Sequence, residues 1–112
     1  MDSLPAPARQ AIRNPDNEAF VSAASAWEMA TKHRLGKLPG VAPVLSGLTS
    51  HLRRANLRVL PVALEHALAA GALPGPHRDP FDRLLMAQAQ LEGLEVVTVD
   101  PVFRDYGVPV IW

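Results

Sequence analysis

The chain has 112 residues, the size of one ordinary domain, and we expect a single domain over residues 1–112 with one functional site. Eleven Lys and Arg balance eleven Asp and Glu, so net charge does not by itself indicate a nucleic-acid partner. With 48% hydrophobic and 20% charged residues, the composition indicates a packed globule and excludes extended disorder. The absence of cysteine excludes disulfides and thiolate metal sites.

Hydropathy indicates where the protein acts. No segment approaches the roughly 18 consecutive apolar residues that a membrane-spanning helix needs. The first residues include Asp2, Pro5 and Pro7, and they lack the basic region and apolar stretch of a signal peptide. We therefore expect a soluble cytoplasmic protein with no membrane partner.

Helical and extended patterns alternate along the chain and are separated by short turns. Ser25 and Glu28 have the spacing of a capping box at a helix start, and Asp79 followed by Pro80 is a good cap and first-turn pair. The β-branched run Val96–Val99 is typical of a strand that is buried on both faces. The expected elements are helices over residues 4–12, 22–35, 44–55, 64–70 and 79–92, and strands over residues 19–21, 57–62, 96–99 and 108–112.

This alternation predicts an α/β fold, a three-layer domain built on a mostly parallel sheet. In such sheets ligands collect beyond the carboxyl ends of the strands. Ser22, Glu28 and Asp100 all follow predicted strands closely. We therefore look for the functional site at this edge of the sheet.

Four acids are expected to meet there, namely Glu28, Asp79, Asp82 and Asp100. Carboxylates that lie close together repel one another unless a cation neutralises them. Ligands that are all oxygen favour a hard ion such as Mg²⁺ or Mn²⁺. Such an ion polarises a phosphate and generates hydroxide from bound water, so the group predicts phosphodiester hydrolysis.

Each of these acids also has a purely structural interpretation. Glu28 can be the partner of Ser25 in a capping box, and Asp79 and Asp82 occupy the cap and third positions of their helix. Asp100, which precedes a proline, can be an ordinary turn residue. Only the joint placement of the acids favours chemistry over capping.

The basic and aromatic residues are also open to two interpretations. A histidine in an exposed Pro-Gly loop, such as His77, can contact a phosphate or can simply be solvated. Cations at a helix C-terminus can bind an RNA backbone, but they also complement the helix dipole. Trp27 is more consistent with packing than with base stacking, and no histidine pair has zinc-ligand spacing. The cationic cluster consists of Lys32, His33, Arg34 and Lys37.

Three segments together resemble PIN-domain ribonucleases of the VapC toxin type. They run from Val21 to Leu38, from His77 to Ala89, and from Val97 to Asp100, and the likeness extends from about Leu4 to Trp112. The resemblance implies a ribonuclease that uses Mg²⁺ or Mn²⁺ and is the toxin of a type II toxin-antitoxin system. It implies an RNA substrate, a cognate antitoxin as partner, and a homodimer.

Carried over by motif, the resemblance assigns the catalytic metal ligands to Glu28, Asp82 and Asp100, and it makes Asp79 either a further ligand or a residue that supports the ligands. Four more residues are expected to contact substrate or to support the ligands. They are Ser22, Thr98, Arg83 and His77.

One departure from the family concerns the N-terminus. The family begins with a hydrophobic strand that ends in an aspartate and lies centrally in the sheet, and nothing of this kind precedes Asp2-Ser3-Leu4-Pro5. We therefore expect an N-terminally incomplete domain that lacks one acidic ligand. The alternative function is a catalytically inactive remnant that serves in dimerisation or antitoxin binding, and a third interpretation makes the acids caps in a structural protein.

Overall fold

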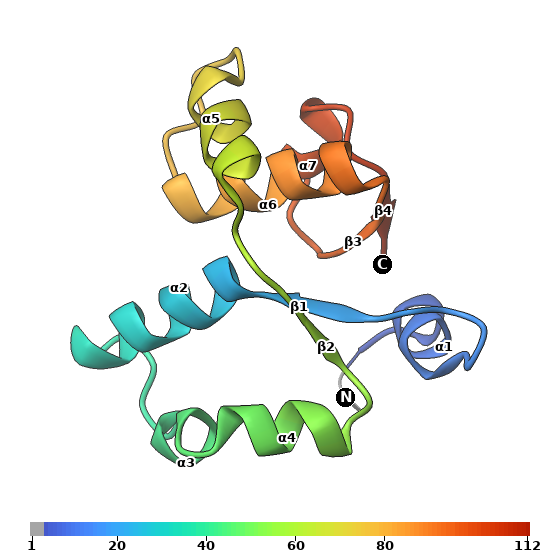
Figure 1. Ribbon diagram of the computed structural model, residues 1–112, viewed down its shortest axis with the longest axis vertical. Helices are drawn as coiled ribbons and strands as arrows, with labels where there is room; N and C mark the ends of the chain where they lie inside the picture. The colour runs from blue at the N-terminus through green and yellow to red at the C-terminus, as the bar shows by residue number, and fades with distance from the viewer. Residues whose placement is uncertain (1–3) are drawn as a thin grey trace. The chain divides into compact units, whose positions relative to one another are not determined.

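The computed structural model describes residues 4–112, which divide into two compact units (Figure 1). One unit consists of residues 19–62, and the other of residues 4–18 together with residues 63–112. The helices are α1 (Ala6–Arg13), α2 (Ala23–Arg34), α3 (Ala42–Leu45), α4 (Leu48–Arg54), α5 (Leu64–Ala72), α6 (Pro80–Glu92) and α7 (Val102–Asp105). The strands are β1 (Phe20–Ser22), β2 (Arg58–Leu60), β3 (Val96–Val97) and β4 (Val110–Ile111).

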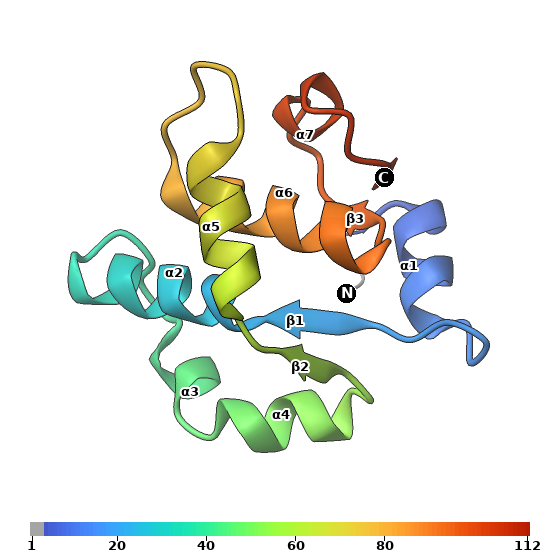
Figure 2. The ribbon, with the colours of Figure 1, turned by 45° about the horizontal axis from the view of Figure 1, so that its top comes forward.

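The unit of residues 19–62 contains a parallel pair of strands, β1 and β2, which lie side by side in Figure 2. Phe20 is opposite Arg58, and Ser22 is opposite Leu60. Helix α2 begins directly after β1, because the Ser22 hydroxyl accepts a hydrogen bond from the backbone N–H of Ala24 at 3.0 Å. The predicted passage from strand to helix is confirmed. The cap is Ser22, however, so the expected capping box at Ser25 is wrong.

The backbone conformations of two glycines differ from what two of the helix predictions assumed. The single helix expected over residues 44–55 is wrong, because Gly47 adopts a left-handed conformation with φ of 73° and separates α3 from α4. Conversely, α5 does not stop at Gly71 but continues to Ala72. A glycine ends a helix only where its backbone turns left-handed, and the φ of Gly71 is not positive.

The second unit contains the parallel pair β3 and β4, with Val96 opposite Val110. The strand predicted over residues 96–99 is shorter, and its expected burial on both faces is wrong, since Val99 is 70% exposed. The cause is local: the Thr98 hydroxyl accepts a hydrogen bond from the backbone N–H of Asp100 at 3.1 Å, which turns the chain out of the ladder.

Helix α6 is the centre of the second unit. It packs against α5, and its Met86 and Ala89 form a buried cluster with Phe103 of α7 and with Val108. As predicted, Asp79 caps α6, Pro80 is its first residue, and Gly93, whose φ is 67°, ends it. Buried apolar contacts therefore hold the second half of α6 and the segment around α7 within one packed unit.

The predicted α/β class and the parallel pairing of strands are both confirmed. We expected one mostly parallel sheet, and the described strands form two separate two-stranded sheets. The first three residues, on which the expectation of an absent N-terminal strand depends, lie outside the described residues. In the described part of the chain, no helix is both long and apolar enough to cross a membrane.

Candidate active site

Asp79 occupies the cap of α6. Its Oδ1 accepts hydrogen bonds from the backbone N–H groups of Phe81 at 2.9 Å and of Asp82 at 3.2 Å. These N–H groups have no partner within the helix, and the carboxylate also complements the positive end of the helix dipole. The capping interpretation of Asp79 is therefore confirmed, and its Oδ2 has no hydrogen-bond partner among residues 4–112.

Asp82, in the first turn of α6, forms a pair with His77. The Nε2 of His77 lies 2.9 Å from Oδ2 of Asp82, and the two side chains are 28% and 20% exposed. A carboxylate held in this way has a fixed orientation, which is how proteins commonly support carboxylates that bind metals. The structure thus joins two of the predicted site residues.

Arg83 fixes the loop that carries His77. Its Nε donates to the carbonyl oxygen of Ala70 at 3.0 Å, and its Nη1 donates to that of His77 at 2.9 Å. Its Nη2 donates to the carbonyl oxygen of Leu73. A planar guanidinium can make these bonds at once because its donors form a rigid fork. Arg83 therefore ties the end of α5 and the following loop to α6.

Asp100 lies in the turn between β3 and α7. Its Oδ1 accepts a hydrogen bond from the backbone N–H of Val102 at 3.0 Å, and its own N–H donates to Thr98. This is the turn role that the structural interpretation assigned to it. The second carboxylate oxygen has no hydrogen-bond partner in the described part of the chain, and Asp100 is exposed. The turn role uses only Oδ1 of Asp100 and leaves Oδ2 available to a ligand.

Glu28 belongs to the other unit, on α2. Its Oε2 forms an ion pair with Nζ of Lys32 at 2.9 Å, one helical turn further along. The Glu28 side chain is 22% exposed. Ser22, which was expected near the site, is the buried N-cap of the same helix. Both residues thus have structural roles within α2.

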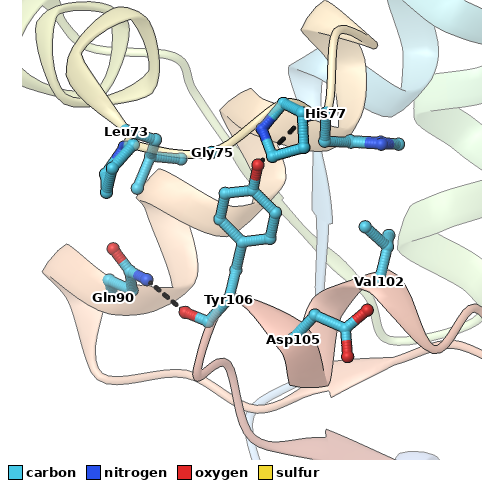
Figure 3. A pocket seen from close by; sticks show the side chains of 9 residues that line it. Leu73, Gly75, His77, Gln90, Val102, Asp105 and Tyr106 are labelled. Atoms are coloured by element: carbon cyan, nitrogen blue, oxygen red, sulfur yellow. Dashed lines mark hydrogen bonds between the residues drawn. The ribbon is translucent and has the colours of Figure 1, made fainter.

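Tyr106 is a residue that sequence reasoning missed. It lies at the centre of a pocket of about 810 Å³ in the unit that holds α6 and α7 (Figure 3). Its hydroxyl accepts a hydrogen bond from the backbone N–H of His77 at 3.1 Å, so it holds the same loop that Arg83 holds. As the chain's one tyrosine it belongs to no motif, and only its contacts reveal it. The pocket is lined by Leu73, Pro74, Gly75, Pro76, His77, Gln90, Val102, Asp105 and Tyr106.

Comparison with known proteins identifies the family. The family model of the PIN domain matches residues 1–109, almost the whole chain. This chain belongs to the PIN domain family. The PIN domain is also similar to Ribonuclease VapC16 of Mycobacterium tuberculosis (strain ATCC 25618 / H37Rv), with 39% identity over 62 residues. That match covers 55% of this chain and 43% of the relative, so the chain matches less than half of the relative's length. No solved structure gives a significant match.

These findings confirm the resemblance to VapC-type PIN ribonucleases that the three sequence segments indicated. The donor chemistry of the PIN domain's carboxylates fits a hard divalent cation, because every candidate ligand is an oxygen. Within residues 4–112, however, no three His, Asp or Glu side chains come together as a group that could hold a metal. The ligand set of Glu28, Asp79, Asp82 and Asp100 therefore stays a prediction.

Proposed function

We propose that this PIN domain is a metal-dependent endoribonuclease, the toxin component of a type II toxin-antitoxin system, acting on RNA in the cytoplasm. The observation that carries the proposal is the match of the PIN family model to residues 1–109, together with the likeness to a ribonuclease over 62 residues. A cognate antitoxin and a second copy of the chain are the partners that we propose with it.

In the proposed site Glu28, Asp82 and Asp100 hold Mg²⁺ or Mn²⁺, and Asp79 supports them from the start of α6. The bound ion would polarise the scissile phosphate and supply a hydroxide nucleophile. The chain's own residues prepare the site: His77 orients Asp82 through its 2.9 Å contact. Thr98 and the backbone N–H of Val102 hold Asp100 in its turn.

Cleavage of RNA by the purified chain tests this function. We expect cleavage at millimolar Mn²⁺ that stops when a chelator is added and that is lost in Asp82→Asn, a change that keeps the size of the side chain but removes its charge. Arg53→Gln is a matched control, because Arg53 is exposed on α4 and belongs to no proposed site. RNA that remains intact with Mn²⁺ and folded protein would refute catalysis by this chain.

A second candidate function is an inactive PIN module that captures an antitoxin or dimerises. The observation that favours it is the lack, within the described residues, of any group of three metal-binding side chains. Such a module would neither cleave RNA nor bind Mn²⁺. A loss of cleavage in Asp82→Asn therefore argues against it.

A further inference from the structure

The pocket around Tyr106 is adjacent to the proposed catalytic acids. His77 lines this pocket, and the same side chain contacts Asp82. A volume of about 810 Å³ lies within the range of roughly 300–1,000 Å³ that is typical of ligand sites. Most of the lining is apolar or aromatic, so the pocket has the size and the character to take a flat organic group.

The ring of Tyr106 is held in place before any ligand binds. Its hydroxyl accepts from the His77 N–H, and its backbone carbonyl accepts from Nε2 of Gln90 at 3.1 Å (Figure 3). The ring also packs against the buried cluster around Phe103. Gly75 fits closely against it, since a Cβ at Gly75 would lie 2.4 Å from the Tyr106 hydroxyl oxygen. Stacking on a ring that is already fixed costs little further conformational entropy.

The charge that lines the pocket favours a base over a phosphate as the group bound inside it. Asp105 lines the pocket, and its carboxylate repels phosphates but accepts hydrogen bonds from the amino and imino groups of a base. Arg78 directly follows His77, and Arg104 directly precedes Asp105. Both arginines are exposed, and neither side chain has an ion-pair or hydrogen-bond partner among residues 4–112. Each arginine is therefore the direct sequence neighbour of a residue that lines the pocket, and its cation is available to a ligand.

We propose that this pocket binds one unpaired base of a single-stranded RNA, which stacks on Tyr106 while Arg78 and Arg104 contact the neighbouring phosphates. Aromatic stacking combined with phosphate contacts is the general mode of single-strand recognition. The inference rests on the proposed ribonuclease function and adds to it a binding position for one base of the substrate at Tyr106.

Fluorescence of a 2-aminopurine base in a short single-stranded RNA tests the stacking directly. In the presence of a chelator, so that no RNA is cut, we expect the intact chain to quench this fluorescence. Tyr106→Phe keeps the ring and should keep the quenching. Tyr106→Leu should abolish it and weaken binding by about 5- to 150-fold, the factor that the loss of one base–aromatic stack represents. Trp27→Leu, at an exposed aromatic on α2, should leave both readouts unchanged.

A second measurement does not depend on the fold tolerating a change at Tyr106. The surface double variant Arg78→Gln with Arg104→Gln should reduce the magnitude of the slope of log K against log salt concentration by about 1 to 2. The reason is that RNA binding releases fewer counterions when two phosphate contacts are lost. An unchanged salt dependence, or equal quenching by the Leu and Phe variants, would overturn the pocket assignment.

The two proposals fail in different ways. RNA that is cleaved with Mn²⁺ but shows no quenching by the intact chain would contradict the pocket and leave the nuclease function standing. RNA that is bound and quenched but never cut would contradict the nuclease function, and the Tyr106 pocket would remain as a single-strand binding site.

Discussion

Replacing Arg83 with lysine tests whether one guanidinium fixes the loop that carries His77. Arg83 donates to three backbone carbonyls, those of Ala70, Leu73 and His77. A lysine ammonium is a single point of charge and can keep at most one of these bonds in the same geometry. A hydrogen bond that involves a charged group contributes about 1.5–3 kcal/mol, so the loss of two corresponds to about 3–6 kcal/mol.

The expected loss for Arg83→Lys is smaller than this sum, because the carbonyls of Leu73 and His77, two partly exposed residues, regain some hydrogen bonding from water. We expect a loss of about 2–4 kcal/mol in the free energy of unfolding. At about 4 °C per kcal/mol, this lowers the midpoint of thermal unfolding by about 8–16 °C. Urea titration followed by circular dichroism measures the change in the free energy of unfolding, and thermal unfolding followed in the same way measures the change in the midpoint.

Arg104→Lys is the matched control for this experiment. Arg104 is exposed on α7 and makes no side-chain bond among the described residues, so its replacement should change stability by less than about 0.5 kcal/mol. If Arg83→Lys were as stable as this control, the loop would be held by something other than the guanidinium.

Three further predictions concern stability. Gly75→Ala should lower the free energy of unfolding, measured by urea titration, by about 2 kcal/mol or more, because Gly75 has φ of 103° and an added Cβ would meet Tyr106. Gly71→Ala within α5 is its control and should be neutral or stabilise by up to about 1 kcal/mol. Equal effects of the two changes would contradict the close contact between Gly75 and Tyr106. His66→Ala should cost about 1–3 kcal/mol, since Nδ1 of this buried ring accepts a hydrogen bond at the start of α5; a loss under about 0.5 kcal/mol would show that the cap is dispensable. Asp79→Ala should cost about 0.5–2 kcal/mol through the lost helix cap, and melting curves that match the parent would contradict the cap.

Local signals in the sequence predicted much of the fold. The cap at Asp79, the proline at the first turn and the glycine at the end define α6 completely, because each acts within a few residues. Gly47 and Gly71 could not be distinguished in the same way. Whether a glycine turns left-handed depends on what packs around it, and residue type does not reveal this.

The candidate site was predictable only in part. The motifs gave Asp82 and Asp100, and the structure adds the bonds that orient them. The loop contacts of Tyr106 and Arg83 connect positions up to 29 residues apart, and no periodicity or spacing in the sequence encodes such contacts. Only the folded structure therefore identifies residues that position a site through contacts between distant parts of the chain, whereas caps and turns can be predicted from the sequence.

Calorimetric titration with Mn²⁺ measures the proposed metal centre itself, because metal binding can be followed without a chosen RNA. We expect the intact chain to bind Mn²⁺, and we expect Asp82→Asn and Asp100→Asn each to abolish or strongly weaken this binding. The control Arg53→Gln should bind as the parent does. Absence of Mn²⁺ binding by the folded chain, or equal binding by Asp82→Asn and the parent, would contradict the proposal that these carboxylates form the metal centre of a nuclease.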